Sequence, residues 1–469
     1  MKKLICLSFA FLLISCTHKD GYKILSTNDH SLWEVTGNVD QSKEEITLTG
    51  TDSRAAITAF HKNFVLEFEC KTAPGAIGAI SFHSKGITNP DTGYEVLINN
   101  NESPAEWRKT GSLSAIRNFG KCLVANDVWF PVKIEVNDIL IRVYVDGIWI
   151  VDYYQPQHPY RLPEYKDRLL SEGNFVLANY SDVPISFRNL KVKDLPNSVV
   201  DTADVPDEQD DDIIRLQQQN FPTIDAHLHL KGGLTAENVA ELTRKYGITY
   251  GIAPNCGKNF PVTTDEDIYA WLDSMKHHPF LLPMQAEGRE WLVMFSLEAI
   301  QKFDYVFTDA MTWTDDKGRR LRIWIPEETF VDDKQHFMDL LVERAYGIIA
   351  GEPISIYVNP TYLPATLSPE YDTLWTNARM EKIIDACVAK GVAIEINNRF
   401  KIPSRKFIQL AKDKGAKFSI GTNNEGIADV GKLEYAIEMI KACGLTKDNM
   451  WIPTGKIRTS MQGNTLPQE

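Results

Sequence analysis

The sequence predicts two domains of different fold class: an N-terminal all-β jelly-roll sandwich and a C-terminal α/β barrel of seven strands. Three observations carry the prediction. Short alternating segments come first, an acidic segment follows, and strand-like and helix-like segments then alternate along the rest of the chain. The boundaries that follow are 21–195 for the sandwich, 196–214 for a linker and 215–469 for the barrel.

The first domain is predicted from side chains that alternate apolar and polar along short segments, the period of a half-buried strand. Phe64–Glu69, Val132–Val136 and Phe187–Val192 show this pattern, and turn residues such as Asp146 and Gly147 separate the segments. Helical periodicity does not interrupt them. Such a series is typical of an antiparallel sandwich.

The linker is predicted from composition. Residues 196–214 carry few large apolar side chains and many acids, namely Asp201, Asp204, Asp207, Glu208, Asp210, Asp211 and Asp212. Such a segment buries too little apolar surface to fold alone.

The second domain is predicted from seven apolar strand segments with helical segments between them, which indicates a parallel sheet closed into a barrel. The ordinary barrel of this kind has eight strands, so seven is unusual. The strand segments are Thr223–Leu230, Ile248–Asn255, Phe280–Glu287, Tyr305–Asp309, Ile354–Asn359, Val392–Asn397 and Lys417–Asn423.

The N-terminus has the form of a secretory signal. Two lysines precede an apolar run from Leu4 to Ile14, which is shorter than the roughly 20 residues that span a bilayer. The run ends in Leu13-Ile14-Ser15-Cys16, which resembles the lipobox of bacterial lipoprotein precursors. We therefore expect a signal peptide over 1–15, a lipidated N-terminus over 16–20 with the lipid on Cys16, and a cell-envelope protein held on the outer membrane by its lipid alone. Either the periplasmic or the outer face fits.

Composition limits the partners. The net charge of −13 argues against nucleic acid and against anionic membrane surfaces, and it fits neutral substrates such as sugars. The five cysteines that follow Cys16 contain no CxxC pair, so neither a zinc ribbon nor a disulfide framework is indicated. One disulfide, such as Cys70 with Cys122, remains open.

Polar and aromatic side chains gather around one strand of the sandwich and the loop after it. The candidates for sugar binding are Tyr94, Trp107 and Arg108, because rings stack on the C–H faces of sugars and polar groups pair with hydroxyls. Six segments around them, FVLEFECKT, GAISFHS, GYEVLINN, KTGSLSAI, VWFPVKIEVNDILIRVYVDGIWIVDY and ISFRNLKVKDL, resemble in order the 3-keto-disaccharide hydrolase family of concanavalin-like domains.

That resemblance implies a chemistry. A ketone at C3 of a sugar acidifies the hydrogen at C2, so a carboxylate base can start the expulsion of the C1 substituent. Glu95 is the candidate base. Two alternatives stay open: Glu95 is a structural strand residue, or the sandwich binds sugars without cleaving them.

The barrel carries a candidate metal pair in its first strand, which reads Asp225-Ala226-His227-Leu228-His229. Residues two apart on a strand face the same way, so His227 and His229 point together into the barrel mouth. Two such imidazoles are typical metal ligands. The alternative is a pair of hydrogen-bonded core histidines.

The barrel resembles the polymerase-and-histidinol-phosphatase (PHP) family of metal-dependent hydrolases, which form seven-stranded barrels. The His-x-His opening, QAEGREW, YVNP, IEIN and SIGTNNEG lie in the family's order. Several family ligands are replaced, since Asn255, Met311, Asn359 and Asn423-x-Glu425 stand at their positions.

The replacements predict a smaller metal site than the family's clusters. We expect one Zn²⁺ or Mn²⁺ on His227, His229 and Glu287, with Glu287 and Glu425 as candidate catalytic carboxylates. Neutral amides are weak ligands for zinc but good hydrogen-bond partners for hydroxyl groups. The mouth is therefore expected to bind a polyol. The amides in question are Asn255, Asn359, Asn397 and Asn423.

Together these patterns predict a lipid-anchored hydrolase or lyase that acts on glycosides, 3-keto glycosides among them. Two alternatives belong to other classes. One is a glycan-binding lipoprotein without activity, and the other is a metal-dependent hydrolase of a non-sugar substrate.

Overall fold

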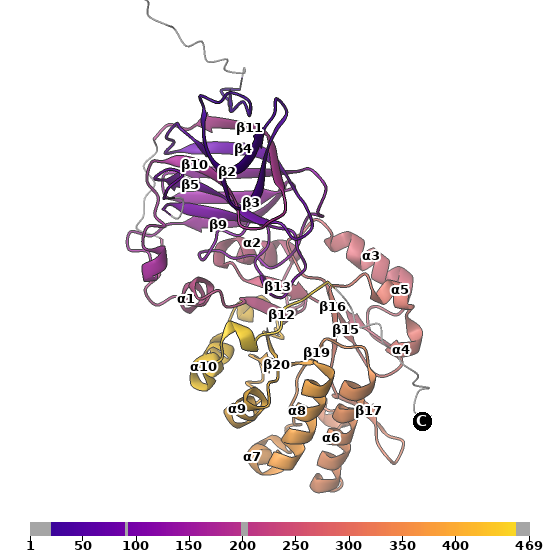
Figure 1. Cartoon of the computed structure of the whole chain (residues 1–469). Helices are drawn as coiled ribbons and strands as arrows, with labels where there is room; N and C mark the ends of the chain where they lie inside the picture. Colours follow the sequence, from indigo (N-terminus) through magenta and orange to yellow (C-terminus); the bar gives the residue numbers. More distant parts are fainter. Residues whose placement is uncertain (1–19, 90–91, 198–204, 456–469) are drawn as a thin grey trace, which may run out of the picture.

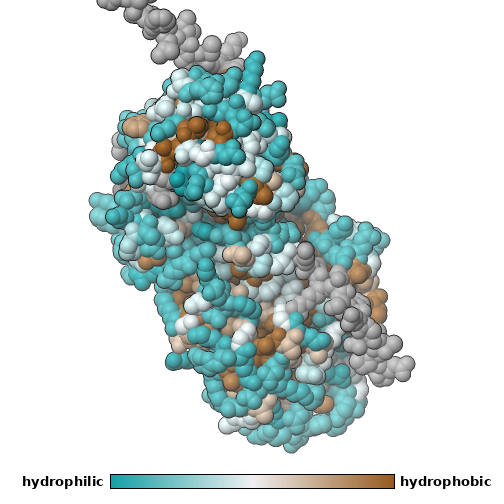
Figure 2. Space-filling view, viewed as in Figure 1, coloured by the Kyte–Doolittle hydropathy of each residue, from teal (hydrophilic) through white to brown (hydrophobic). Residues whose placement is uncertain are grey.

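The computed structural model describes residues 20–89, 92–197 and 205–455 (Figure 1). The predicted signal peptide and Cys16 lie outside these residues, so their assignment stays a prediction. The two predicted domains follow one another, with the sandwich at the top of Figure 1 and the barrel below it. On the face drawn in Figure 2, polar residues cover most of both domains and apolar ones form scattered patches. Within the described ranges, every helix is too short or too polar to cross a membrane.

The N-terminal domain is all β, as predicted. Its described strands are β1 (Lys23–Ile24), β2 (Trp33–Gln41), β3 (Glu45–Ile57), β4 (Phe64–Thr72), β5 (Ile77–Ser84), β6 (Tyr94–Asn99), β7 (Phe130–Asn137), β8 (Leu140–Val145), β9 (Ile148–Tyr154), β10 (Asn174–Asn179) and β11 (Ile185–Asp194). They run antiparallel in the order β6-β5-β10-β3-β11-β4-β7-β8-β9, with β2 beside β3 and β1 beside β11.

The long strand β3 joins the two layers of the sandwich. Its second half pairs with β10 through Arg54–Ala56, and its first half pairs with β11 through Glu45–Leu48. Inward side chains of both layers form a single apolar core that includes Phe82, Tyr94 and Ile134. The jelly-roll prediction is confirmed. The five described cysteines are free thiols, so Cys70 and Cys122 do not form a disulfide.

The C-terminal domain alternates strands and helices. Its strands are β12 (Ile224–Leu228), β13 (Thr249–Ile252), β14 (Asn255–Cys256), β15 (Pro283–Ala286), β16 (Tyr305–Thr308), β19 (Ile356–Tyr357), β20 (Ala393–Asn397) and β21 (Phe418–Gly421), with a small hairpin of β17 (Thr312–Thr314) and β18 (Arg320–Arg322). Its helices are α1 (Asp212–Gln218), α2 (Ala236–Tyr246), α3 (Asp265–Met275), α4 (Trp291–Met294), α5 (Leu297–Ile300), α6 (Lys334–Gly351), α7 (Tyr371–Leu374), α8 (Asn377–Lys390), α9 (Arg405–Asp413) and α10 (Glu434–Cys443).

The parallel strands close into a barrel. Their order is β13-β12-β21-β20-β19-β16-β15-β14, and β13 and β14 are consecutive pieces of one chain segment, 249–256. Pro254 lies between the two pieces, and proline cannot donate to a sheet hydrogen bond. Gly251 also bridges to Leu281, two residues before β15, and this bridge joins the two edges of the sheet. Eight strand segments thus make a seven-stranded barrel, as the sequence predicts.

Helix boundaries follow local chemistry. Thr235 caps α2 and Thr376 caps α8 at their N-termini, and each helix ends at a glycine with a left-handed backbone, Gly247 or Gly391. Both helices lie between strand segments of the barrel, where the sequence predicts helical segments. Figure 1 shows α6, α8, α9 and α10 side by side along the outside of the barrel.

The sandwich packs on the N-terminal ends of the barrel strands. The Gly120 backbone N–H donates to Thr249 Oγ1 at the start of β13, at 2.9 Å. Lys121 Nζ lies 2.6 Å from Asp304 Oδ1, directly before β16. Helix α2 also lies beside β9 of the sandwich (Figure 1). The C-terminal mouth of the barrel therefore faces away from the sandwich.

The described part of the predicted linker is held in place. Glu208 is 4% exposed, and its Oε2 accepts from Arg161 Nη1 at 2.9 Å and from the Tyr160 N–H at 3.1 Å. Asp211 caps helix α1, which begins at Asp212. Several of the acidic residues thus anchor or cap structure.

Candidate functional site

The polar centre of the barrel lies at its mouth, where β12, β15, β16 and β20 end. His227 and His229 come from the end of β12 and are 1% and 6% exposed. Asp225 lies earlier on β12 and is fully buried, and its carboxylate accepts from the Thr422 N–H and hydroxyl at 2.9 and 2.5 Å. Burial raises the pKa of Asp225 to about 6. The sequence prediction that the two histidines face one space is met.

Hydrogen bonds fix the tautomer of each histidine. His229 Nδ1 lies 2.8 Å from the Ala253 carbonyl oxygen, which only accepts, so this nitrogen carries a hydrogen. His227 Nδ1 lies 2.6 Å from Glu395 Oε1, another acceptor. When the rings are neutral, both Nε2 atoms therefore present lone pairs. These two Nε2 atoms face each other at 3.2 Å.

This pair of nitrogens fits a metal ion. Two imidazole nitrogens bound tetrahedrally to one zinc, at about 2.0–2.1 Å each, stand about 3.3 Å apart. The partners of the Nδ1 atoms, a carboxylate and a carbonyl, are those that commonly orient metal-bound histidines. Two facing lone pairs repel unless a proton or a cation lies between them. Burial holds the pKa of His229 well below its ordinary value, so His229 resists taking that proton.

Glu287 does not join the two histidines as a ready third ligand. Its Oε1 accepts from Asn255 Nδ2 at 2.7 Å and from Gln285 Nε2 at 3.0 Å. Among the described residues, no three His, Cys, Asp or Glu side chains are arranged to hold an ion. The predicted trio is thus not preformed. Gln285 lies beside His229, and its Oε1 is buried without a hydrogen-bond partner, which leaves an oxygen available in this space.

Glu287 and Asp309 form a pair of buried carboxyl groups. Burial raises the pKa of Glu287, and the neighbouring Asp309 raises it further. Burial likewise raises the pKa of Asp309, whose oxygens accept from the Met311 N–H at 2.9 Å and from Asn359 Nδ2 at 2.8 Å. Two carboxyl groups this deeply buried retain a proton more readily than ordinary ones.

Three of the predicted asparagines meet around Glu395. Glu395 Oε2 accepts from the Asn359 N–H at 2.7 Å and from Asn397 Nδ2 at 3.0 Å. Asn359 Oδ1 in turn accepts from Asn397 Nδ2 and Asn423 Nδ2, at 3.0 and 3.1 Å. Much of the hydrogen-bonding capacity of these asparagines is thus used in bonds to one another and to Glu395. Asn359 and Asn423 also have left-handed backbones, with φ of 50° and 48°, which asparagine tolerates better than most residues.

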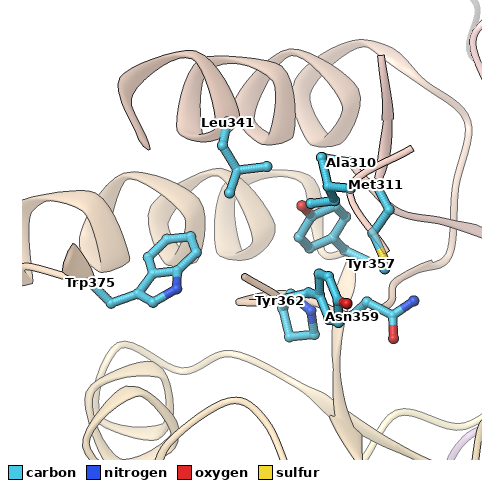
Figure 3. A pocket seen from close by; sticks show the side chains of 9 residues that line it. Ala310, Met311, Leu341, Tyr357, Asn359, Tyr362 and Trp375 are labelled. Atoms are coloured by element: carbon cyan, nitrogen blue, oxygen red, sulfur yellow. The ribbon is translucent and has the colours of Figure 1, made fainter. Parts of the chain in front are cut away.

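A small cavity opens beside Asn359 (Figure 3). Its volume is about 10 Å³, which is room for a single water molecule. Met311 and Tyr362 lie beside Asn359 in Figure 3, while Leu341 and Trp375 line the far side. This cavity is too small for a sugar ring.

The rim of the mouth carries charged side chains. Glu425, a candidate catalytic residue, has a side chain that is 70% exposed and lies 2.6 Å from Arg399 Nη2. Its carboxylate is therefore an exposed ion pair at the rim. Its backbone N–H donates to Asp429 Oδ2 at 2.6 Å, which fixes the loop after β21.

Two of the predicted sugar-binding rings are buried. Tyr94 is fully buried in the core of the sandwich, where its hydroxyl donates to Gln155 Oε1 at 2.7 Å. Trp107 is 2% exposed and packs into the N-terminal end of the barrel. The prediction that these rings lie on an exposed sugar-binding face is therefore corrected. Strand parity turns Tyr94 inward, and the loop after β6 carries Trp107 into the other domain.

Glu95 lies on the opposite face of β6 in a network of hydrogen bonds. Its Oε2 accepts from the Tyr180 hydroxyl at 2.6 Å, and Arg168 Nη2 lies 3.6 Å from Oε1. Burial acts to raise the pKa of Glu95, but Arg168 and Tyr180 outweigh it and the pKa is lowered. The carboxylate is thus ionised and a weak base. Arg108 is held by Glu106 through Nε at 2.9 Å and Nη2 at 2.7 Å.

Three buried carboxylates, those of Asp225, Asp309 and Glu395, are not among the predicted site residues. Glu395 precedes the predicted Asn397 by two positions on the same strand, so strand parity could have placed it in the mouth. Parity does not place Asp225, because the register of β12 shifts between Asp225 and Leu228. Asp309 directly follows β16, where the end of a barrel strand is itself a signal. Of these, Glu395 is the most important because it contacts both His227 and the asparagines.

The fold and the site define a two-domain protein in which a β-sandwich seals one end of a parallel barrel and a polar centre lies at the other. The family model of the 3-keto-alpha-glucoside-1,2-lyase-like domain matches residues 23–193, so the sandwich is a domain of this kind. The first family resemblance is thereby confirmed.

The chain is also similar to a protein named probable phosphatase from Thermoanaerobacter sp. (strain X514), with 35% identity over 77 residues. This match covers 15% of the chain and spans 31% of the phosphatase. Its counterpart from Thermoanaerobacter pseudethanolicus gives the same figures. This relative is in keeping with the resemblance of the barrel to the PHP family.

Two solved structures are similar at lower identity. Histidinol phosphate phosphatase from Lactococcus lactis, complexed with zinc, L-histidinol and phosphate, is 14% identical with a TM-score of 0.36, over 50% of this chain and 99% of that one. A carbohydrate-binding module from Bacillus subtilis is 18% identical with a TM-score of 0.27, over 34% of this chain and 95% of that one.

Proposed function

We propose that this protein is a glycan-processing enzyme of the cell envelope whose catalytic centre is the barrel mouth, built on His227 and His229 around one divalent cation. The observation that carries the proposal is the pair of Nε2 atoms 3.2 Å apart, each on a ring whose Nδ1 already faces an acceptor. Neutral rings in this arrangement leave two lone pairs facing each other in a buried position. A cation between them satisfies both.

The residues of the mouth have separable roles. His227 and His229 hold the ion, Glu395 orients His227, and the Ala253 carbonyl orients His229. A bound Zn²⁺ or Mn²⁺ supplies Lewis acidity and a water of lowered pKa. Glu287 keeps a proton closer to neutral pH than an ordinary carboxyl because it is buried next to Asp309. The amides of Asn255 and Gln285 donate to Oε1 of Glu287 and leave Oε2 without an amide donor. Oε2 can therefore donate the proton to the oxygen of a leaving group.

The proposed substrate is a glycoside, including 3-keto glycosides. The match of the sandwich to a lyase-like domain of keto-glucosides supports this class. The asparagines of the mouth support it as well, because neutral amides pair with hydroxyl groups. In the sandwich, the ionised Glu95 beside Arg168 fits hydroxyl recognition better than proton abstraction.

The proposed location is the outer membrane, with the protein held by a lipid on Cys16 and facing the periplasm or the exterior. The basic start, the short apolar run and the lipobox-like ending support it. Cys16→Ser is expected to move the protein from the membrane fraction to the soluble fraction. Wild-type protein that carries no acyl chain would refute the anchor.

The test of the catalytic proposal is metal analysis followed by activity. Purified wild-type protein, loaded with Zn²⁺ or Mn²⁺ and freed of excess, is expected to hold one ion per chain by mass spectrometry. His229→Ala is expected to hold none, because its other partner is only a backbone carbonyl. Glycosides and their 3-keto forms are then offered to both proteins. A wild type without stoichiometric metal would overturn the proposal.

Two other outcomes define the alternatives. Sugar-dependent thermal stabilisation without metal or turnover would indicate a glycan-binding lipoprotein. Metal-dependent cleavage of phosphate esters but not of glycosides would indicate a hydrolase of a non-sugar substrate.

A further inference from the structure

Trp107 reaches from the sandwich into the barrel. Its indole is 2% exposed and its Nε1 donates to Asn220 Oδ1 at 2.8 Å, just before β12. The ring belongs to the apolar cluster that fills the N-terminal half of the barrel. We call this cluster the floor; its buried members are Trp107, Ile224, Ala226, Ala253, Leu281, Tyr305, Phe307, Ile356, Val358 and Ala393.

The barrel leaves room for this ring. A barrel interior is normally filled by bulky branched residues of its own strands. Here three of the inward positions are alanines, at 226, 253 and 393, and β13 carries Gly251. A methyl group on Gly251 would lie 1.9 Å from the Tyr305 hydroxyl. Small residues on several strands thus accommodate three large rings, Tyr305 and Phe307 from the barrel and Trp107 from the sandwich.

The floor touches the metal pair by two routes. The Tyr305 hydroxyl donates to the Ala226 carbonyl at 2.8 Å, one residue before His227. The Phe307 ring lies 4.6 Å, centroid to centroid, from the His227 imidazole and 6.2 Å from the Tyr305 ring. The first route fixes the backbone of β12, and the second limits the tilt of the imidazole.

We infer that Trp107 is a positioning residue for the cation site. The indole of the sandwich completes the floor, and the floor fixes the position and ring orientation of His227. In that orientation the Nε2 atom of His227 faces the Nε2 atom of His229. This inference rests on the proposed function for the site itself. It gives the sandwich a role in the barrel's chemistry even though the sandwich packs on the end of the barrel opposite to the mouth. Trp107 acts through the shared packing of the floor, in which Tyr305 and Phe307 contact Ala226 and His227.

The test uses the full-length protein and Co²⁺ as the probe. Titration of Co²⁺ gives an affinity by calorimetry and a visible absorption spectrum that reports the coordination geometry. Trp107→Ala is expected to lower the affinity at least tenfold and to alter the spectrum. Trp107→Phe is expected to restore most of the affinity because a ring refills the floor. Tyr305→Phe, which removes only the bond to Ala226, is expected to lie between wild type and Trp107→Ala.

Trp149→Ala is the matched control. Trp149 is also a sandwich tryptophan at the domain joint, with Arg244 of α2 over its ring at 4.5 Å, but it lies outside the floor. Its removal is expected to leave the Co²⁺ affinity and spectrum unchanged. A folded Trp107→Ala protein with wild-type affinity would overturn the inference. Should that variant not fold, wild-type affinity and an unaltered spectrum in Tyr305→Phe would overturn it as well.

Failure of the proposed function is distinguishable from failure of the inference. A wild type that binds no Co²⁺ refutes the metal site alone. The imidazole NMR signals of His227 and His229 in metal-free protein then decide, since they report ring environment without an ion. Signals that shift in Trp107→Phe but not in Trp149→Ala support the positioning role, and signals that do not shift refute it.

Discussion

The two ends of the barrel are built from the same strands and are opposite in character. At the N-terminal end, the floor is apolar and closed by Trp107 of the sandwich. At the C-terminal end, the mouth holds four buried carboxyl groups, those of Asp225, Glu287, Asp309 and Glu395. The difference shows how the fold divides its tasks: one end supplies stability, and the other carries groups that a stable core would exclude.

The mouth is costly to fold. Burying an ionisable group disfavours its charged form, and burial raises the pKa of Asp225, Glu287 and Asp309. Glu395 is held by His227 and by two amide donors. Apolar burial at the floor offsets this cost, since large buried rings contribute the most area. We therefore expect substitutions at the floor to reduce stability and those at the mouth to reduce binding.

The largest effect is expected for Trp107→Ala. Removing a buried aromatic ring leaves a cavity, and the expected loss is about 3–5 kcal/mol of unfolding free energy. Urea unfolding followed by far-UV circular dichroism measures it. Trp324→Ala is the matched control from a half-exposed loop, and a loss below about 1 kcal/mol is expected there. Equal losses in the two variants would mean that the floor is not the stable end.

The second prediction concerns Glu395→Gln. An amide in place of the carboxylate presents an N–H to the Asn359 and Asn397 donors or to the His227 nitrogen, so one buried contact is lost in either orientation. A loss of about 1–3 kcal/mol is expected. Metal affinity should fall about 10–100-fold, as for other outer partners of a ligating histidine. Calorimetric titration with Zn²⁺ measures this affinity.

The exposed Glu434→Gln on α10 serves as the control for Glu395→Gln and should change neither quantity. Loss of stability in Glu395→Gln without loss of metal affinity would contradict a role of Glu395 in orienting His227. That result would also mean that the buried groups of the mouth serve stability and do not serve metal binding.

The third prediction moves to the sandwich and uses pH. The folded-state pKa of Glu95 is lowered, so its stabilisation is present above the unfolded pKa of about 4.3 and is lost as the pH falls through the folded-state value. Glu95→Gln should therefore cost about 1 kcal/mol at pH 7. The difference from wild type should shrink below about pH 4. Unfolding curves at several pH values measure it, with the exposed Glu44→Gln as the control. A difference that does not depend on pH would exclude an ionised Glu95 as its cause.

The sequence carried enough information for both folds. Strand periodicity predicted the sandwich, and the count of seven strand segments predicted the barrel, because each local pattern agrees with the element that forms. Strand parity also placed His227 and His229 together, since two-residue spacing acts within one strand. The caps Thr235 and Thr376 are local signals of the same kind.

The rest depended on contacts between distant segments. That Trp107 enters the barrel could not be read from its neighbours, because its partners at 220 and 224 belong to another domain. That Asn255 donates a hydrogen bond to Glu287 likewise depends on two different strands meeting. Asn359 and Asn423 were interpreted as ligands for hydroxyls, yet their left-handed backbones give a second reason for asparagine that no sequence pattern showed.

The smallest effect is expected for the ion pair at the edge of the floor. Lys121 Nζ lies 2.6 and 2.7 Å from the two oxygens of Asp304, and both side chains are 20% exposed. Lys121→Met keeps the aliphatic stem and removes the charge. Asp304 Oδ2 still accepts from the Leu282 N–H at 2.6 Å, so the remaining carboxylate keeps a partner.

A loss of only about 0.2–1 kcal/mol is therefore expected for Lys121→Met, because partly exposed ion pairs are screened and gain little. The same urea unfolding measurement at 1 M salt should reduce the loss further, since the Debye length there is about 3 Å. A loss as large as that of Trp107→Ala would mean that charge, and not the buried indole, joins the sandwich to the barrel. The expected result is a small, salt-sensitive loss of unfolding free energy for Lys121→Met and a large, salt-insensitive one for Trp107→Ala. That result would mean that apolar burial at the floor, and not the ion pair, stabilises the interface between the sandwich and the barrel.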